Sequence, residues 1–340
     1  MSGDKIENYE YVIDALSQGL IVTNTFGNVI VMNKEAKKIV CPNCEATKGK
    51  PLVSFLNNRE IIEVVQKAEN KKTNVYKDYE TPDGKHYKVN IYSIENDIGN
   101  GLSNNHVCIV FDDVTQERIL SKSKRDFFAN ASHELKSPLT SVMGYIQLVK
   151  EGIVTDPAEV AKIFQRTIFE ANRMNEIIIQ MLDLSKLEVS VPKPFESISC
   201  KSVIDESCAM LQQLMKNKRI KITRKNDDFN IFLVKEDALS LIKNIIENGI
   251  RYNSEGGEIY IVMNAKEKSV SIRDTGIGIS KSAQDRIFER FYRVDKAKSR
   301  KMGGTGLGLS IVKHICINYK LKLELDSKLG EGATFKIFFN

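Results

Sequence analysis

The chain has no run of apolar residues that approaches the roughly 18 residues of a membrane span. Residues 1–8 also lack the apolar core of a signal peptide. The formal net charge of +6 is mild, and no basic stripe with interleaved aromatic residues accompanies it. We therefore expect a cytoplasmic protein with no membrane span in this chain and no direct contact with nucleic acid.

Cysteine is too sparse for a disulfide framework, because 340 residues contain only six. Only Cys41 and Cys44 are paired by spacing, in the segment Cys41-Pro42-Asn43-Cys44. This pair is compatible with half of a metal knuckle or with a redox pair, but a closed metal site normally needs four ligands. The other cysteines stand singly: Cys108, Cys200, Cys208 and Cys316.

A histidine-centred segment organises the middle of the chain. Apolar or small residues recur there at alternating steps of three and four, as in the seam of a helical bundle: Phe128, Ala131, Leu135, Pro138, Val142, Tyr145 and Val149. This spacing predicts a helix on which His133 lies off the seam and faces solvent, with Ser137 one turn further on the same surface. Pro138 removes the amide that would bond the Glu134 carbonyl, so we expect the helix to bend or loosen there.

Residues 127–140, Phe-Phe-Ala-Asn-Ala-Ser-His-Glu-Leu-Lys-Ser-Pro-Leu-Thr, resemble the phosphoacceptor box of sensor histidine kinases. The resemblance implies that His133 accepts a phosphoryl group, that Glu134 orients the imidazole and takes its proton, and that Lys136 lies near the incoming phosphate. The chemistry agrees, because a neutral imidazole is a good nucleophile near pH 7 and a carboxylate stabilises its developing positive charge.

The first 115 residues show a mixed pattern that predicts a small α+β module. Residues 20–23 and 29–32 read as strands around a hairpin loop, and residues 75–80 and 86–93 flank a second turn at 81–85. We expect a flexible loop at 96–105, followed by a strand at 107–111. The arrangement resembles a PAS sensor domain, through Gly19 to Asn24, Gly27, Asn33 to Ala36 and the terminal Asp113-Val114-Thr115. Binding of a small-molecule ligand or protein partner is the favoured role, and a dimerising spacer is the alternative.

A second helix is expected between Pro157 and about Glu188, after a glycine at 152 and a cap at Thr155 or Asp156. Its predicted apolar face consists of Phe164, Ile168, Ala171, Met174, Ile178 and Met181. Two such helices cannot enclose a core alone, so we expect a homodimer in which two hairpins form a four-helix bundle. Residues 191–194, Val-Pro-Lys-Pro, then read as a short stiff linker.

Three motifs mark the remainder of the chain, which alternates helical and strand patterns. Asn244 and Asn248 share one face of an apolar helix, Asp274-Thr-Gly-Ile-Gly278 follows a strand, and a glycine-rich stretch from Gly303 to Gly308 opens a helix. A glycine-rich approach to a helix N-terminus suits phosphate, because backbone amides face the anion. Taken singly, each motif also fits an ordinary polar stripe or a tight turn.

In this order, with Ile287-Phe-Glu-Arg-Phe-Tyr292 between the last two, the motifs resemble the ATP-binding domain of histidine kinases and related ATPases. The resemblance implies that Asp274 accepts the adenine amino group and that Asn248 binds Mg²⁺, a cation that prefers oxygen ligands. It also implies that further residues line the nucleotide site: Asn244, Arg251, Tyr252, Gly276, Gly278, Arg293, Gly304, Gly306, Leu307 and Gly308. Residues 280–302 resemble a mobile lid whose cations meet the triphosphate: Arg293, Lys296, Lys298, Arg300 and Lys301.

The chain is too long for one compact core, and we predict a multidomain protein. Its parts are an α+β PAS-like sensor at 1–115, an antiparallel helical hairpin that forms a dimeric four-helix bundle at 116–190, and an α/β-sandwich ATP-binding domain at 195–340.

The function that the resemblance implies is that of a homodimeric sensor histidine kinase. It would use ATP and Mg²⁺ to phosphorylate His133 and pass the phosphoryl group to an aspartate of a response regulator. One alternative is a sensor scaffold that has lost catalysis, but no nucleotide or phosphoacceptor motif is missing. The other is an ATP-driven clamp of the chaperone or mismatch-repair type, which has no reason to carry the histidine box. Many family members carry threonine or asparagine where this chain has Ser137, so we expect regulator phosphatase activity to be weak.

Overall fold

The computed structural model describes residues 11–68, 74–97, 103–188, 194–225, 227–294 and 304–339. These form two compact units, residues 1–125 and residues 126–340, and each is described by itself. Among the helices that the structure describes, none combines the length and the hydropathy that a membrane span requires.

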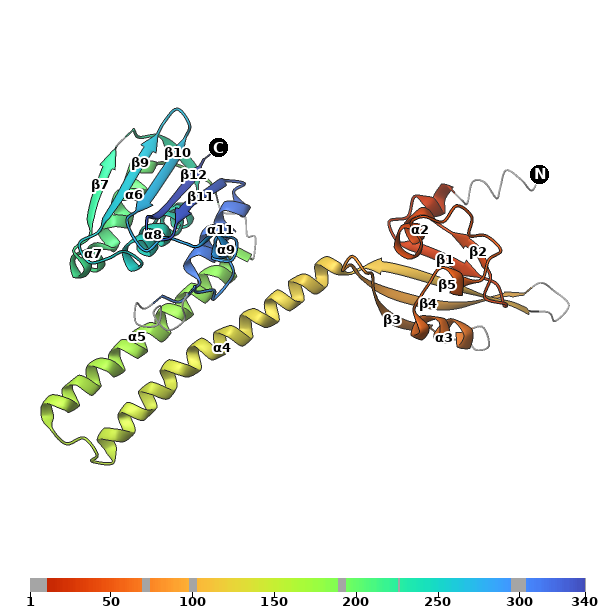
Figure 1. Ribbon diagram of the computed structural model, residues 1–340, viewed down its shortest axis with the longest axis horizontal. Coiled ribbons are helices and arrows are strands. Elements are labelled where there is room, and N and C mark those ends of the chain that lie inside the picture. Colours follow the sequence, from red (N-terminus) through yellow and green to blue (C-terminus); the bar gives the residue numbers. More distant parts are fainter. Residues whose placement is uncertain are drawn as a thin grey trace. The chain divides into compact units, whose positions relative to one another are not determined.

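The first unit is built on one antiparallel sheet with strand order β2-β1-β5-β4-β3 (Figure 1). Its elements are β1 (Gly19–Thr23), β2 (Val29–Met32), α2 (Lys34–Val40), η1 (Leu52–Ser54), α3 (Arg59–Ala68), β3 (Asn74–Glu80), β4 (His86–Asp97) and β5 (Ser103–Asp113). Helix α2 contacts β1, and α3 contacts β3 and β4. A cluster around Ile21, Ile91 and Phe111 forms the core of this unit.

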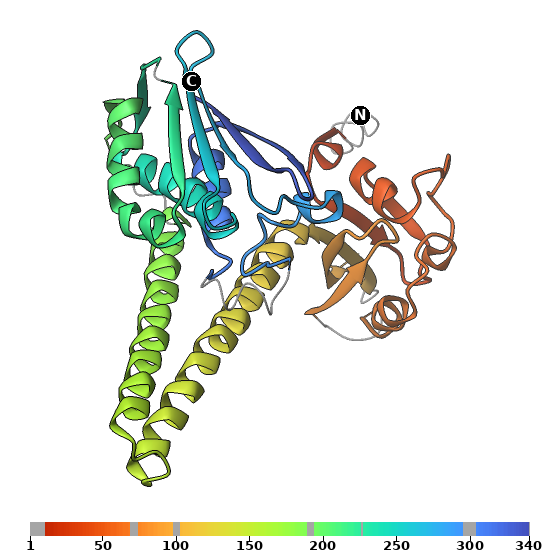
Figure 2. The same cartoon turned by 60° about the vertical axis from the view of Figure 1, so that its left-hand side comes forward.

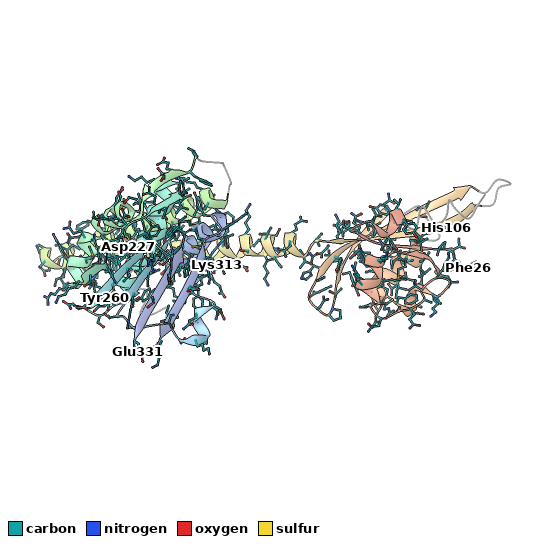
Figure 3. All side chains as sticks on the ribbon, turned by 90° about the horizontal axis from the view of Figure 1, so that it is seen from above. Phe26, His106, Asp227, Tyr260, Lys313 and Glu331 are labelled. Carbon is teal, nitrogen blue, oxygen red and sulfur yellow. The ribbon has the colours of Figure 1, made fainter. Side chains whose placement is uncertain are left out.

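Both hairpins predicted in this unit are confirmed. Strand β1 pairs with β2, and β3 pairs with β4, each in antiparallel register. Phe26, which is 82% exposed, lies in the turn between β1 and β2 (Figure 3). The loop predicted at 96–105 is too long, because β4 and β5 stay in register as far as the pair Asp97 and Ser103. Polar residues there continue the ladder, since the backbone bonds do not depend on apolar side chains.

Two long helices follow, α4 (Thr115–Lys150) and α5 (Pro157–Glu188), joined by a short turn. Figure 2 shows α4 in yellow and α5 in green. Helix α4 runs through Pro138 without interruption. Helix α5 begins at Pro157 as predicted, and Asp156 accepts a hydrogen bond from the amide of Ala158 (3.2 Å).

The apolar face predicted for α5 differs from the face that is buried within the chain. Ile163, Ile177 and Leu184 are buried, whereas Phe164, Ile168 and Ile178 are exposed. The buried face is therefore shifted by about one residue around the helix. Apolar residues cover a wide arc of the α5 surface. Their spacing does not show which part of that arc packs against the same chain.

The rest of the second unit is a five-stranded sheet of order β11-β12-β10-β9-β7, in which only the β7–β9 pair is parallel, beside a two-stranded sheet of β6 and β8. The strands are β6 (Glu196–Ser199), β7 (Lys221–Lys225), β8 (Asn230–Leu233), β9 (Glu258–Asn264), β10 (Ser269–Asp274), β11 (Lys322–Lys328) and β12 (Gly332–Phe338). The helices are α6 (Cys200–Met210), α7 (Gln212–Lys218), α8 (Lys235–Arg251), α9 (Lys281–Gln284) and α11 (Gly308–Asn318).

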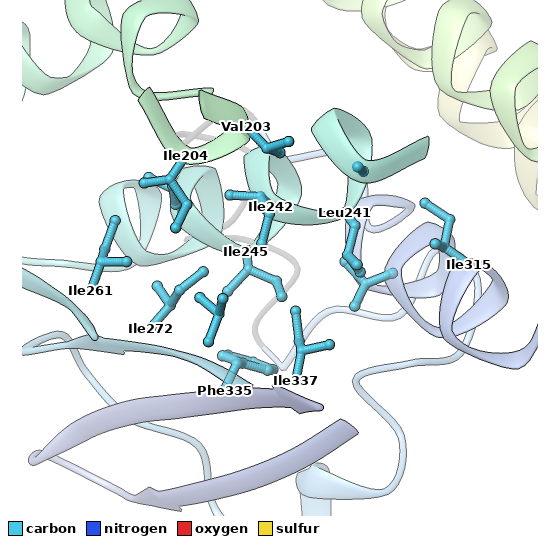
Figure 4. Packing of buried hydrophobic residues seen from close by; sticks show 14 of the residues in the cluster. Val203, Ile204, Leu241, Ile242, Ile245, Ile261, Ile272, Ile315, Phe335 and Ile337 are labelled. Carbon is cyan, nitrogen blue, oxygen red and sulfur yellow. The ribbon is translucent and has the colours of Figure 1, made fainter. Parts of the chain in front are cut away.

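The core of this α/β sandwich lies between the sheet and three helices. Figure 4 shows Val203 and Ile204 of α6, Leu241, Ile242 and Ile245 of α8 and Ile315 of α11 packed against strand residues that include Ile261, Ile272, Phe335 and Ile337. Leu184 of α5 joins the same cluster, and the Asn318 side chain of α11 donates to the Leu187 carbonyl (3.0 Å). The C-terminal end of α5 is thus anchored in the sandwich. Residues 191–193 of the predicted linker lie outside the described residues.

Candidate nucleotide pocket and phosphoacceptor helix

A cavity of about 620 Å³ opens in the second unit, beside α8 and the C-terminal end of β10. Its lining includes ten of the residues predicted for the nucleotide site: Asn244, Asn248, Arg251, Tyr252, Asp274, Gly278, Arg293, Gly304, Gly306 and Gly308. The lining also includes the apolar side chains of Ile279, Ile287 and Phe335. These residues come from five separate parts of the sequence and meet around one space of the size that small-molecule sites have.

Two predicted residues do not line this cavity. Gly276 lies behind it, where its amide donates to Oδ1 of Asp274 (2.8 Å). The Leu307 side chain is fully buried, and its amide donates to Oγ1 of Thr305 (3.2 Å). Leu307 thus contributes to the core beneath the start of α11 rather than to the wall of the cavity.

Asp274 is the buried acid of the cavity. It ends β10, and its Oδ1 accepts from the amides of Gly276 (2.8 Å) and Ala333 (3.3 Å). Burial raises the pKa of this carboxyl above its usual value, although both amides act in the opposite direction. Both of these bonds end on Oδ1, so Oδ2 is suited to a ligand that donates a hydrogen bond.

Two glycines shape the cavity through backbone conformations that other residues rarely adopt. Gly278 has a φ of +66°, and a Cβ atom placed on it would lie 2.0 Å from the Lys328 carbonyl oxygen. Gly306 has a φ of +79°, and its Cβ would lie 2.9 Å from the backbone of Phe291. Any side chain at either position would displace the wall of the cavity.

Helix α8 supplies the polar wall. The Arg251 guanidinium pairs with Glu247 (2.6 Å) one turn away and with Glu176 of α5 (3.5 Å). The Asn244 amide donates to the Ser240 carbonyl (2.8 Å), whereas Nδ2 of Asn248 is buried without a partner in the described part of the chain. Such an orphaned amide is a reasonable contact for a bound group, because a buried polar atom without a partner is costly.

The predicted phosphoacceptor residues lie on α4. His133, Lys136 and Ser137 are exposed, and Glu134 is half-buried. Oε2 of Glu134 accepts from Nη2 of Arg173 on α5 (3.4 Å) and from Nη2 of Arg293 (3.2 Å). The side chains of these two arginines are only 8% and 3% exposed, so one carboxylate oxygen holds two buried cations.

Further contacts join α4 and α5 to the loops around the cavity. The ring of Phe127 packs on that of Phe291 (5.7 Å between centroids), and the Arg290 guanidinium lies over Phe127 (5.3 Å). Oγ1 of Thr305 donates to the Gln180 side chain. Phe291 has a φ of +61°, an unfavourable conformation for a bulky residue, and its amide donates to the Gly306 carbonyl (2.9 Å).

Sequence reasoning did not identify Arg173 or Gln180 as site residues. Arg173 lies away from the predicted apolar residues of α5, where we would expect a polar side chain to face solvent. The spacing of apolar residues does not show that a charged side chain at this position is buried. The predicted lid residues Lys296, Lys298, Arg300 and Lys301 lie outside the described residues, as does Gly303.

Two family models match the chain. Residues 123–189 match the His Kinase A (phospho-acceptor) domain, and residues 234–340 match the Histidine kinase-, DNA gyrase B-, and HSP90-like ATPase domain. The chain carries the phosphoacceptor and ATPase domains that sensor histidine kinases have. An ATPase clamp lacks the first of these domains, so this pair of matches excludes that alternative.

Curated relatives agree with this assignment. The chain is 29% identical to the sensor histidine kinase WalK of Bacillus subtilis over 95% of its own length and 53% of the relative. It is 34% identical to the sensor-like histidine kinase SenX3 of Mycolicibacterium smegmatis, over 67% of its length and 60% of the relative. The chain thus spans about half to three-fifths of the length of these relatives.

Solved histidine kinases share the fold. The structure of histidine kinase ThkA in complex with response regulator protein TrrA aligns with a TM-score of 0.50 at 20% identity, over 96% of this chain and 97% of that chain. The Acinetobacter baumannii histidine kinase AdeS aligns over 61% of this chain and 97% of that one, also with a TM-score of 0.50, at 19% identity.

Replacing the buried acid Asp274 should weaken nucleotide binding without lowering the stability of the fold. In Asp274→Asn we expect roughly 10- to 100-fold weaker ATP binding, the range that a charge-assisted hydrogen bond represents. Because the folded-state pKa is raised, the acid contributes most to stability at low pH, and this contribution falls as pH rises through the folded-state value. At pH 7 the variant should therefore melt no lower than wild type.

Fluorescent ATP-analogue titration and calorimetry measure both quantities. Asp285→Asn, which changes an exposed acid at the C-terminal end of α9, is the control and should leave affinity unchanged. In wild type, ATP affinity should begin to fall at a higher pH than an ordinary aspartate would give, because the protonated acid is a poorer acceptor. Unchanged ATP affinity in Asp274→Asn would exclude the acid from the binding site.

Arg293 both lines the cavity and pairs with Glu134, so these two roles should compete. In Glu134→Gln we expect ATP to bind about 3- to 10-fold more tightly, because the phosphates no longer have to displace a carboxylate. The same titration tests this expectation. Glu170→Gln, which removes the other ion pair of Arg173 (3.8 Å), is the matched control and should bind ATP like wild type. Weaker or equal binding in Glu134→Gln would show that the two roles do not compete.

Proposed function

We propose that this protein is a sensor histidine kinase that transfers the γ-phosphoryl group of ATP to His133 and then to an aspartate of a response regulator. The observation that carries this proposal is the presence, in one compact unit, of an exposed histidine on a phosphoacceptor-type helix and an ATPase-type cavity with a buried acid. The structural relative ThkA is in complex with a response regulator protein, which supports a regulator as the partner.

The proposed chemistry follows from the residue types. The neutral imidazole of His133 attacks the γ-phosphorus, the bond from that phosphorus to the bridging oxygen breaks, and ADP leaves. Glu134 takes the imidazole proton, and Lys136 attracts the transferred phosphate. In the observed arrangement Oε2 of Glu134 is held by two guanidinium groups, so we assign this arrangement to a state in which the proton acceptor is occupied.

The cavity also has residues that fit Mg²⁺. The carboxamide of Asn248 lines the cavity with its Nδ2 unpartnered among the described residues. Oxygen and nitrogen of such an amide exchange places by rotation, so an oxygen ligand is available. Bound Mg²⁺ neutralises charge on the phosphate oxygens. Asn244 and Arg251 would hold the nucleotide around it.

A second copy of the chain is part of the proposal. Apolar side chains remain exposed along both long helices: Phe128, Leu139, Met143, Ile146, Phe164, Ile168 and Ile178. Packing two hairpins into a four-helix bundle would bury them. A monomeric mass in sedimentation equilibrium at micromolar concentration would contradict the homodimer.

We also propose a PAS-like sensory role for the N-terminal unit, with a small molecule or a protein as its ligand. The support is the five-stranded antiparallel sheet with helices packed on it. A cytoplasmic location completes the proposal, because ATP is the phosphoryl donor. Kinase activity that is identical with and without this unit, under every condition tested, would argue against sensing.

The nucleophile assignment has a direct test. In His133→Gln we expect autophosphorylation to be abolished and ATP affinity to be kept, because His133 does not line the cavity. The measurement is incorporation of labelled γ-phosphate that is stable to alkali and labile to acid. Label retained by His133→Gln would reject His133, and no label on wild type would reject the kinase in favour of a scaffold.

Ser137 should govern a weak phosphatase activity toward the regulator. Its hydroxyl is exposed one turn from His133, where it can orient water against a phosphoaspartate. Serine holds its hydroxyl less firmly than β-branched threonine, so decay of a phosphorylated regulator with ADP present should slow in Ser137→Ala and quicken in Ser137→Thr. Autophosphorylation should be largely kept in both. Equal decay rates for the three proteins would show that Ser137 has no such role.

A further inference from the structure

The cysteine pair of the N-terminal unit is not used by the proposed kinase reaction. Cys41 caps the C-terminal end of α2, and its amide donates to the Lys37 carbonyl (2.9 Å). The Cys44 amide donates to the Cys41 carbonyl (3.1 Å), which closes a four-residue turn around Pro42 and Asn43. The ends of such a turn lie within about 7 Å, and a disulfide needs Cα atoms about 4.4–6.8 Å apart.

The turn places the two side chains at its ends. Burial and the neighbouring Cys44 both raise the pKa of the Cys41 thiol. Proline fixes φ near the value that the second position of a turn requires, so Pro42 leaves the backbone little freedom to separate the two residues. The turn is therefore organised for a bond between Cys41 and Cys44 before any oxidant arrives.

The two cysteines differ in their exposure to solvent, and we expect them to have different roles in the reaction. Cys41 is 8% exposed, and burial raises its pKa to about 11. Cys44 is half-buried, so its sulfur is the one that a reagent reaches first. The remaining cysteines stand apart from this turn, and burial raises the pKa of each of them: Cys108, Cys200, Cys208 and Cys316.

We propose that Cys41 and Cys44 form a redox-active dithiol that small disulfide compounds oxidise to an intramolecular disulfide. The thiolate of Cys44 attacks one sulfur of the external disulfide, whose S–S bond breaks and releases one thiolate. The sulfur of Cys41 loses its proton and attacks Cys44, which breaks the mixed disulfide and releases the second thiolate. The protein loses two electrons and two protons, and the external disulfide becomes two thiols.

A bound metal ion is the competing use of such a pair. Two thiolates provide half of the four ligands that a closed zinc site needs. Within the part of the chain that the structure describes, no group of three or more His, Cys, Asp or Glu side chains is arranged to hold a metal. The dithiol reaction needs no further ligand, so the observations favour it.

Oxidation would act on an element that contacts the sheet. Helix α2 packs on β1, and the chain after Cys44 pairs with β2, where the Gly49 amide donates to the Val29 carbonyl (2.8 Å). A bond between Cys41 and Cys44 would close the turn between the end of α2 and the segment that leads to this pairing. This places a covalent, reversible change in the unit for which we propose a sensory role.

The test uses the full chain, reduced and freed of reductant, and incubated with glutathione disulfide. Wild type should lose two hydrogens in the peptide that contains both cysteines and should recover them with dithiothreitol. Cys41→Ser should instead retain glutathione on Cys44, whereas Cys44→Ser should react at Cys41 at least tenfold more slowly. Cys108→Ser is the control and should oxidise like wild type.

Three results would overturn the proposal. They are a wild-type chain whose two thiols stay free at every ratio of glutathione disulfide to glutathione, a Cys44→Ser variant that reacts as fast as Cys41→Ser, and bound zinc that only the two cysteines retain. Circular dichroism verifies the fold of each variant, and Cys41→Ala replaces Cys41→Ser if serine is not tolerated at that buried position. None of these readouts depends on kinase activity, so the proposal and the proposed function fail separately.

Discussion

One carboxylate oxygen, Oε2 of Glu134, connects three parts of the second unit: α4, α5 and the loop beside the cavity. It binds Arg173 from the second long helix and Arg293 from the loop beside the cavity. Both arginines are almost fully buried, and a buried cation without an anion is costly. When Glu134 becomes free to take a proton, Arg173 keeps its second ion pair with Glu170 (3.8 Å), whereas the Arg293 guanidinium loses this carboxylate. A nucleotide phosphate in the neighbouring cavity is suited to replace it beside Arg293, which already lines the cavity wall.

Further contacts beside Glu134 also join the two long helices to the loops around the cavity. Packing of Phe127 on Phe291 and the bond between Gln180 and Thr305 hold the cavity loops against α4 and α5. Phe291 keeps an unfavourable backbone conformation in this position, at a cost on the order of 1–3 kcal/mol. That cost is offset only while the aromatic contact and the bond to Gly306 persist, so the loop conformation depends on the helices.

The sequence predicts most of the local structure because the signals are local. Turn residues identify both hairpins, Pro157 identifies the start of α5, and the glycines identify where the backbone bends around the cavity. The prediction is poorer where the environment of a residue depends on a partner far away in the sequence. Within one chain, α5 buries Ile163, Ile177 and Leu184 rather than the predicted face, which we assign to a second hairpin. The ladder between β4 and β5 continues through polar residues whose sequence indicates a loop.

The same distinction applies to the candidate site. Asp274 and the asparagines of α8 follow from motifs of fixed spacing, and ten of the predicted residues line one cavity. Arg173 and Gln180 escaped prediction because their importance lies in contacts with residues far along the chain, Glu134 and Thr305. A single sequence does not show which polar residue of a helix a folded chain will bury. Leu307 is the opposite case. It belongs to the glycine-rich motif, but its side chain is buried and does not line the cavity.

The position of Arg293 has a consequence for the direction of signalling. If nucleotide and Glu134 compete for one guanidinium, thermodynamic reciprocity requires that each weakens the hold of the other by the same factor. A movement of α4 that weakens the ion pair then raises the affinity for nucleotide, and nucleotide binding in turn eases that movement. Nucleotide concentration and the position of α4 would then act on a single equilibrium, so either one could be read out through the other.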